Sequence, residues 1–206
     1  MNILILGATG RVGCQLVNYA LHENHHVTAL VRTPEKIQIN NEQLTILQGN
    51  VLNKEDIERA MVGIDVVVSA LNTDGATTLS DSMPHIIEAM ESEGIQRIIT
   101  IGTAGILQSR TTPSLLRYQS SESKRKSTRA AEDHHKAYDL LNQSSLQWTI
   151  VCPTYLPDGD RVGEYRVERD FLPVDGVKIH VSDTAEFTYK QINSNKYINS
   201  RVGIAY

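Results

Sequence analysis

The chain begins with residues 1–13, MNILILGATGRVG, and this stretch indicates its fold. Four apolar residues at 3–6 precede Gly7, Gly10 and Gly13, and an amphipathic run follows at once. The order is therefore a buried strand, a glycine turn and a helix. Such a turn lets the backbone press against a pyrophosphate, because glycines carry no Cβ and the helix start offers free N–H groups and a positive dipole end. The stretch predicts a nucleotide-binding turn.

The rest of the chain alternates apolar strands with helices, and no hairpin signal falls between them. After the strand at 3–6, strands are expected at 27–31, 44–47, 65–70, 97–101 and 148–151, then short ones at 165–168 and 177–181 and a final edge strand at 201–205. After the helix that begins at Val12, helices are expected at 54–61, 84–93, 130–142 and 182–192, with Pro34 opening a short one and Ser182 capping the last. This alternation predicts an α/β fold of Rossmann type, a doubly wound parallel sheet in three αβα layers. The length of 206 residues suits one domain, 1–206.

The composition of the chain indicates which partners and which cellular location to expect. The net charge is −4, which gives no reason to expect a nucleic acid or an anionic membrane as partner. The chain has two cysteines, Cys14 and Cys152, without metal-ligand spacing, so two free thiols and no metal are expected. The first apolar run is too short for a signal peptide, and no segment has the apolar length of a membrane span. A soluble, cytoplasmic protein is expected.

Two regions are expected to form the substrate side. Residues 108–129 are rich in Ser and Thr and carry the basic run Lys124-Arg125-Lys126, and so long a connection is usually a functional lid or a mobile surface segment. Both interpretations are compatible. Residues 154–206 are expected to add a small C-terminal region of substrate-side elements and a helix.

Residues that follow each strand are the candidates for cofactor binding. Ligands of parallel sheets lie beyond the carboxyl ends of the strands. The expected contacts are Gly7, Thr9, Gly10, Arg11, Val12, Gly13, Arg32, Thr33, Asn50, Val51, Ala70, Leu71, Asn72, Thr103, Ala104, Pro153, Thr154 and Tyr155.

The end of the second strand indicates which nucleotide is bound. An NAD site usually has an Asp or Glu there, which accepts hydrogen bonds from the ribose 2′-hydroxyl. This chain has Arg32 and Thr33 instead, and Arg32 can grip a 2′-phosphate with two N–H groups. Arg11 could approach the same phosphate from the glycine loop. With no acid competing in the sequence, NADP(H) is expected in preference to NAD(H), unless both arginines are merely exposed.

Several motifs together resemble the atypical short-chain dehydrogenase/reductase families. They are the GxxGxxG turn, Val31-Arg32, Gly49-Asn50-Val51 and the stretch 148–153, WTIVCP. The nearest resemblance is to NmrA-like NAD(P)-binding proteins and to the flavin reductase/biliverdin reductase B group. It covers nearly the whole chain and implies that Asn50 and Val51 lie beside the adenine. It also implies that Ala70, Leu71 and Asn72 pass the nicotinamide-side ribose.

The resemblance is weaker at the catalytic positions. The Tyr-x-x-x-Lys pair of typical short-chain dehydrogenases is replaced by a helix that begins Ala130-Ala131 and places His134 where the lysine would be. The resemblance makes His134 the candidate catalytic residue, as a proton donor or as a group that orients the ribose. Ala104 and Thr154 stand where the flavin reductase group has a serine and a histidine. Biliverdin is therefore a poor candidate substrate, whereas a flavin or quinone needs little acid–base help.

Three hypotheses follow. The first is an NADPH-dependent reductase of a flat small-molecule acceptor such as a flavin or quinone. The second is an NmrA-like NADP(H) sensor that passes the redox state to a regulatory protein partner, with no turnover. The third, nucleotide-sugar epimerase or dehydratase activity, is weaker because those enzymes normally have the Tyr-Lys pair and a larger substrate domain.

Overall fold

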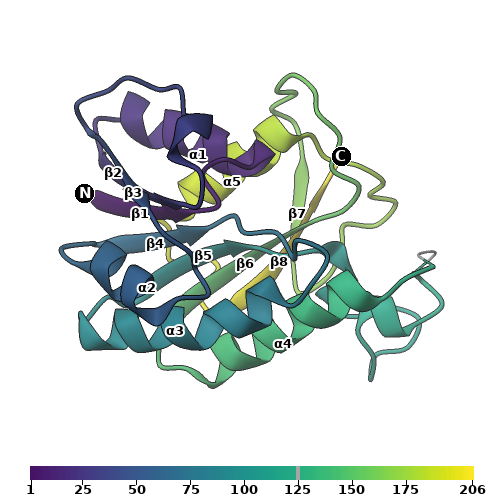
Figure 1. The fold of residues 1–206 in the computed structure, drawn as a ribbon. Helices are drawn as coiled ribbons and strands as arrows, with labels where there is room; N and C mark the ends of the chain where they lie inside the picture. The colour runs from purple at the N-terminus through teal and green to yellow at the C-terminus, as the bar shows by residue number, and fades with distance from the viewer. Residues whose placement is uncertain (124–125) are drawn as a thin grey trace.

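A central sheet organises the chain. The computed structural model describes residues 1–123 and 126–206, and in these residues eight strands form one sheet in the order β3-β2-β1-β4-β5-β6-β8-β7 (Figure 1). The strands are β1 (Asn2–Leu6), β2 (His26–Val31), β3 (Leu44–Gln48), β4 (Val66–Ser69), β5 (Arg97–Ile101), β6 (Gln147–Pro153), β7 (Arg166–Arg169) and β8 (Ser200–Ala205). The strands pair in parallel throughout, except that β7 runs antiparallel to β8. Lys124 and Arg125 of the basic run lie outside the described residues.

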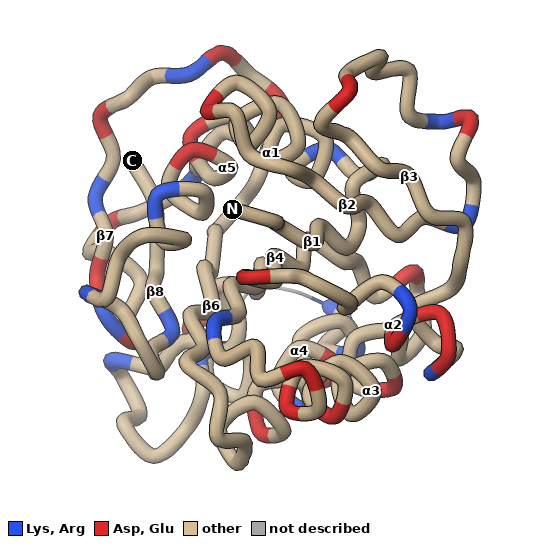
Figure 2. The backbone as a smooth tube through the Cα atoms, turned by 90° about the vertical axis from the view of Figure 1, so that its left-hand side faces the viewer, with Lys and Arg blue, Asp and Glu red and all other residues tan. Residues whose placement is uncertain are grey.

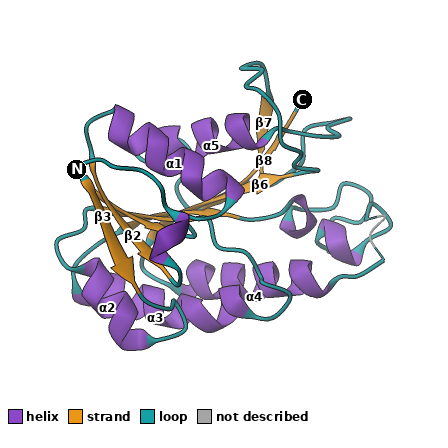
Figure 3. Cartoon of the chain, turned by 45° about the horizontal axis from the view of Figure 1, so that its top comes forward, coloured by secondary structure: helices purple, strands orange, loops and turns teal. Residues whose placement is uncertain are grey.

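Helices cover both faces of the sheet (Figure 3). One face carries α1 (Arg11–His22) and α5 (Val181–Lys190), and the other carries α2 (Lys54–Met61), α3 (Thr78–Ser92) and α4 (Arg129–Gln143). Three short 3₁₀ helices, η1 (Pro34–Lys36), η2 (Ala104–Ile106) and η3 (Arg117–Gln119), lie in the connections that the structure describes. The predicted three-layer Rossmann fold in a single α/β domain is confirmed.

The first strand shows why the sheet is buried on both sides. Side chains alternate along a strand, so Leu4 and Leu6 enter the core under α2, α3 and α4, whereas Ile3 and Ile5 enter the core under α1 and α5. All four are at most 1% exposed. A continuous apolar run is the pattern of a parallel strand covered on both faces.

Helix α3 differs from its prediction at its first residue. It begins at Thr78 and not at Pro84, which lies inside the helix and supplies no N–H to it. The first turn is instead stabilised from outside by Asp133 of α4, which accepts hydrogen bonds from the backbone N–H groups of Leu79 and Ser80. This contact crosses the tertiary structure, so the local pattern around Pro84 could not show it.

The C-terminal region differs in three further details. The strand at 200–205 was expected at an edge but lies between β6 and β7, and β7 is the edge strand. Residues 177–181 add no named strand; Lys178 makes an isolated bridge to Tyr155. Helix α5 follows His180 at its N-cap, and the hydroxyl of Ser182 donates to the Gly159 carbonyl instead of capping the helix.

The surface agrees with a chain that is close to neutral. Figure 2 shows Lys and Arg spread among Asp and Glu over most of the chain, although α3 carries acidic residues only. Among the helices of residues 1–123 and 126–206, none combines the length and apolar content needed to cross a bilayer.

Candidate active site

Two cavities open along the carboxyl edge of the sheet. The first, about 140 Å³, lies beyond β1, β2, β3 and β4. The second, about 370 Å³, lies beyond β5 and β6. Because β4 and β5 are neighbours in the sheet, the two cavities follow one another along the same edge. This is where ligands of open α/β sheets bind.

The glycine turn forms the base of the first cavity and leaves no room for side chains. Gly7 has φ +80°, and a Cβ on it would lie 2.5 Å from the Ala70 carbonyl oxygen. A Cβ on Gly13 would lie 2.1 Å from the Gly7 carbonyl oxygen. Helix α1 starts after Gly10, with no side-chain cap and no acidic residue in its first turn. The free N–H groups and the positive dipole end therefore face the cavity without a competing anion from their own helix, which suits a pyrophosphate.

Nine predicted contacts line the first cavity. They are Gly7, Thr9, Gly10, Arg32, Asn50, Val51, Ala70, Leu71 and Asn72. Asn50 uses its side-chain oxygen to accept from the Leu52 N–H at 3.1 Å, and its own N–H donates to Asp56 at 2.8 Å. These two bonds hold the turn after β3 against the cavity, beside the buried Val51.

Arg32 meets an acidic partner that the sequence analysis missed. Its Nη2 lies 2.7 Å from Oδ2 of Asp74, and both residues line the first cavity. Asp74 lies 42 positions further along the chain, in the turn after β4. The expectation that no acid competes at this end of the site is wrong, because the sheet order brings that turn close to the end of β2.

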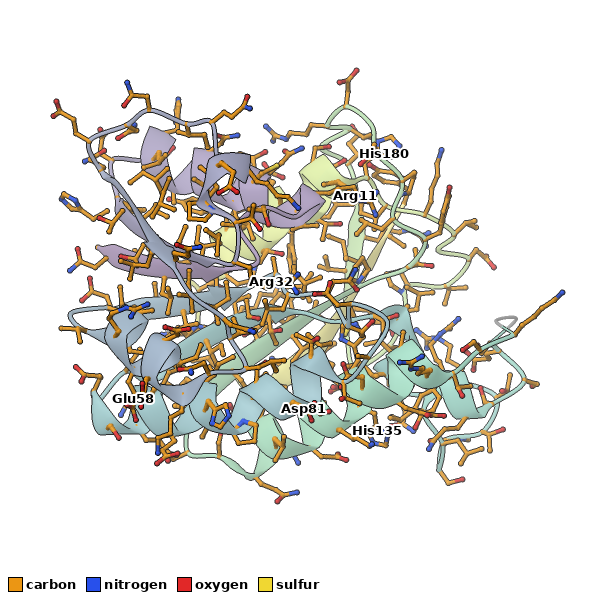
Figure 4. The ribbon with its side chains drawn as sticks, in the orientation of Figure 1. Arg11, Arg32, Glu58, Asp81, His135 and His180 are labelled. Atoms are coloured by element: carbon orange, nitrogen blue, oxygen red, sulfur yellow. The ribbon has the colours of Figure 1, made fainter. Side chains whose placement is uncertain are left out.

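Arg11 is turned away from this end. Its Nη1 donates to the Leu156 carbonyl and to Asp158, both at 3.0 Å, so it ties α1 to the segment after β6 (Figure 4). Val12 and Gly13 are buried in α1, and Thr33 precedes η1 without a side-chain cap bond. These four predicted contacts do not line the first cavity.

The second cavity contains the other five predicted contacts, Thr103, Ala104, Pro153, Thr154 and Tyr155. Ala130 and Ala131 of α4 also line it, as do Tyr118 and the Arg117–Glu122 ion pair. Two apolar side chains stand open at the lining, since Tyr155 is 65% exposed and Val177 is 72% exposed. Their segments are joined by a hydrogen bond from the Thr154 hydroxyl to the Val177 carbonyl.

Glu122 organises the segment that forms one wall of the second cavity. One of its oxygens accepts from the Ser109 hydroxyl and the Thr111 N–H, both at 2.9 Å, and from the Arg110 N–H at 2.5 Å. Its other oxygen lies 2.6 Å from Arg117 Nη1. Burial alone would raise the pKa of this carboxyl, but these hydrogen bonds and the arginine charge together hold the pKa below its ordinary value. No local pattern in the sequence marks Glu122 for this role.

Tyr118 links the second cavity to α4. Its hydroxyl lies 2.9 Å from Nδ1 of His135 and accepts from Gln119 at 3.3 Å. Burial, aided by the charges of Glu132 and Asp139, raises the pKa of Tyr118. The phenol is therefore protonated at neutral pH.

His134 occupies a different place from the second cavity. It lines an inner space of about 10 Å³ with core residues such as Leu79, Met83 and Ile150, next to Gly102. The preceding residue, Asp133, is 2% exposed, and its carboxylate accepts a hydrogen bond from the backbone at the start of α3. Asp133 therefore stabilises the fold. The sequence pattern could not distinguish this role from that of the neighbouring candidate catalytic residue, His134. In the described residues no group of three or more His, Cys, Asp or Glu is placed to hold a metal ion.

Residues 7–195 match the model of a family described as NAD(P)H-binding. The chain is 29% identical over 179 residues to the uncharacterized protein YwnB of Bacillus subtilis, covering 82% of this chain and 80% of YwnB. It is also 29% identical over 106 residues to the photosystem II assembly factor Ycf39 of Synechocystis, which is 48% of this chain and 32% of that protein. The match to Ycf39 thus spans about a third of its length.

Solved structures show the same fold over the whole chain. A proposed epimerase from Bacteroides thetaiotaomicron has a TM-score of 0.86 at 30% identity, covering 100% of this chain and 96% of that one. A proposed NADH-flavin reductase from Streptococcus pneumoniae has a TM-score of 0.83 at 23% identity, with 100% and 99% covered. A short-chain dehydrogenase/reductase from Veillonella parvula, solved in complex with NADP, has a TM-score of 0.79 at 20% identity, with 100% and 94% covered. The family model confirms the resemblance to NAD(P)-binding proteins, and the solved structures share the fold.

Proposed function

The chain belongs to the NAD(P)H-binding family, and from that premise we propose that it is an NADPH-dependent reductase that transfers hydride to a flat acceptor such as a flavin or quinone. The observation that supports this proposal best is the pair of cavities along one edge of the sheet. The glycine turn lines the first cavity, and the second is larger and lined mostly by uncharged residues. The nucleotide would occupy the first cavity and extend to the second, where its nicotinamide would meet the acceptor.

The first cavity would hold the adenosine, the pyrophosphate and the adjoining ribose of the nucleotide. The glycine turn and the start of α1 would bind the pyrophosphate, and Arg32 would bind the 2′-phosphate. Asn50 and Val51 would flank the adenine, and residues 70–72 would guide the ribose toward β5. When bound, NADPH supplies a hydride, and the chemistry belongs to the cofactor.

The second cavity suits a planar acceptor. Ala104, Ala130 and Ala131 keep part of its lining small, whereas Tyr155 and Val177 offer open apolar surface against which a ring can stack. The two alanines of α4 cannot donate protons, so a reaction that depends on a tyrosine–lysine pair in this helix has no support. Reduction of a flavin or quinone depends mainly on stacking and orientation. His134 remains the candidate for proton donation or ribose orientation.

The other two hypotheses predict different behaviour. The lack of a tyrosine–lysine pair in α4, where Ala130 and Ala131 stand near its start, also suits a sensor without turnover. Such a protein would bind NADP(H) and a regulatory partner. The similarity to a proposed epimerase keeps nucleotide-sugar chemistry as the weakest option, since Ala130 and Ala131 begin the helix that would carry its tyrosine.

Oxidation of NADPH with a panel of FMN, FAD, riboflavin and menadione tests the proposal. We expect turnover with at least one acceptor, and Tyr155→Ala should raise the KM for that acceptor about fivefold and the NADPH Kd by a smaller factor, because a stacked ring loses on the order of 1 kcal/mol. Val162→Ala, at another exposed apolar residue outside the second cavity, is the matched control. Tight NADPH binding without turnover with any acceptor would favour the sensor.

A further inference from the structure

Arg32 and Asp74 form an ion pair at the edge of the first cavity. Nη2 of Arg32 lies 2.7 Å from Oδ2 of Asp74, with 68% and 41% of the two side chains exposed. Arg32 follows β2 and Asp74 lies in the turn after β4, and these strands flank β1 on its two sides. The carboxylate of Asp74 therefore binds the same guanidinium that would bind the 2′-phosphate in the proposed function.

We propose that Asp74 competes with the 2′-phosphate of NADP(H) for Arg32, and so determines how strongly the protein prefers NADP(H) to NAD(H). The inference rests on the proposed nucleotide site and adds a specificity-determining residue to it. A free guanidinium would favour NADP(H) strongly; a guanidinium that already has an anionic partner favours it less.

The turn that carries Asp74 is held in place at its base by packing and by hydrogen bonds. Thr73 is 7% exposed, and its N–H donates to the Asn72 side chain at 2.7 Å. Asp74 and Gly75 both have positive φ, +50° and +71°, and the Ala76 N–H closes the turn on the Thr73 carbonyl at 2.8 Å. Aspartate is one of the few residues that tolerate this conformation. The base of the turn is therefore packed, whereas Asp74 at its tip is partly exposed beside the cavity.

Binding of NADP(H) would break the ion pair. A phosphate carries up to two negative charges and three acceptor oxygens, so it takes the planar guanidinium from a single carboxylate. Asp74 is then left beside a like charge, and the tip of the turn moves away from it. Because the pair is exposed, its loss costs the protein little.

Binding of NAD(H) would leave the pair intact. No phosphate competes for Arg32, and Asp74 remains beside the cavity as an acceptor for a ribose hydroxyl. An acidic residue is the usual partner of that hydroxyl in NAD sites, although it normally follows the second strand. Asp74 therefore favours NAD(H) and opposes NADP(H) at one position.

Direct titration of the purified protein with NADPH and with NADH, without any acceptor, tests the inference. Asp74→Asn preserves the size of the side chain and removes its charge. We expect it to lower the NADPH Kd about five- to tenfold and to leave the NADH Kd unchanged or higher, because one charge is removed beside a phosphate. Arg32→Gln should raise the NADPH Kd at least about tenfold in the same assay.

Glu88→Gln is the matched control, because Glu88 forms another exposed ion pair, with Lys54, away from both cavities. It should leave the ratio of the two Kd values within about twofold. If Asp74→Asn also leaves the ratio within twofold, or raises the NADPH Kd, Asp74 does not compete and the inference is overturned. Failure of Arg32→Gln to change the ratio would instead remove the proposed 2′-phosphate site.

Discussion

The carboxylate of Asp133 accepts a hydrogen bond from the backbone N–H of Leu79 at 3.1 Å, across 54 positions of the chain. It also accepts from the Ser80 N–H at 3.0 Å, so α4 caps the first turn of α3. The local N-cap residue of α3, Thr77, makes no such bond. The start of one helix on this face of the sheet therefore depends on a side chain of its neighbour.

Removal of this cap should lower the stability of the fold. Asp133→Ala is expected to decrease the free energy of unfolding by about 2–3 kcal/mol, because one buried and one partly buried N–H group lose their acceptor. Urea unfolding of both proteins measures the difference. Asp139→Asn, at an exposed acid of the same helix, is the control and should change the value by less than about 0.5 kcal/mol. Equal effects of the two substitutions would contradict the capping role.

Gly13 tests the close packing of α1 on the glycine turn. Gly13→Ala would place a Cβ 2.1 Å from the Gly7 carbonyl oxygen, so the turn must shift. We expect the NADPH Kd to rise at least about tenfold, together with a loss of about 1–3 kcal/mol of stability, because backbone displacement follows overpacking. Fluorescence titration and thermal unfolding measure the two effects. Asn18→Ala, at an exposed position of α1, should leave both nearly unchanged; unaltered binding in Gly13→Ala would show that the turn does not hold the nucleotide.

Arg11 should matter for the segment after β6 more than for the choice of cofactor. Arg11→Gln removes the bonds to Leu156 and Asp158, so amide hydrogen exchange in residues 156–164 should become faster. The ratio of the NADPH and NADH Kd values should stay within about twofold, since the guanidinium points away from Arg32. A selective loss of NADPH affinity would restore Arg11 as a ligand of the 2′-phosphate.

The pKa of Glu122 predicts a pH-dependent contribution to stability. Its folded pKa is lowered, so the carboxylate stabilises the fold above the unfolded value, and this contribution disappears as the pH falls through the folded pKa. The Tm difference between the wild-type protein and Glu122→Gln should therefore be large at about pH 6 and should shrink below about pH 4, near the ordinary glutamate value. Glu42→Gln, at an exposed glutamate, is the control. A constant difference across this range would show that the charge of Glu122 is not what holds residues 109–117.

The two thiols should differ in reactivity. Cys152 is fully buried, and burial raises its pKa to about 12, whereas Cys14 is exposed. Because the thiolate is the reactive species, a thiol reagent at about pH 8 should modify one cysteine of the folded protein and the second only after unfolding. Cys14→Ser should abolish the fast reaction. Rapid modification of Cys152 in that variant would show that β6 opens readily.

The strands could be predicted from the sequence wherever successive side chains along the strand are all buried. Residues 3–6 and 66–68 are apolar on both faces, which only a doubly covered strand tolerates, and β1 and β4 lie in the middle of the sheet. The last strand was expected at an edge of the sheet but lies between β6 and β7. In the structure Arg201 is 7% exposed, because its guanidinium donates to the Ile106 carbonyl at 2.6 Å and lies over the Tyr138 ring. A charge can be buried when partners from distant segments satisfy it.

The glycine turn, the alternation of strands and helices and the residues that end each strand could be read from the chain alone, because these depend on local sterics and on hydrophobic periodicity. They predicted the Rossmann fold, and fourteen of the eighteen expected cofactor contacts line one of the two cavities. Which charges meet depends on the folded arrangement. The sheet order brings Arg32 next to Asp74, and Arg11 forms its ion pair with Asp158 in the segment after β6. The packing of α3 on α4 lets Asp133 accept hydrogen bonds from the start of α3. These contacts depend on distances between segments that are far apart in the chain, and no local pattern encodes those distances.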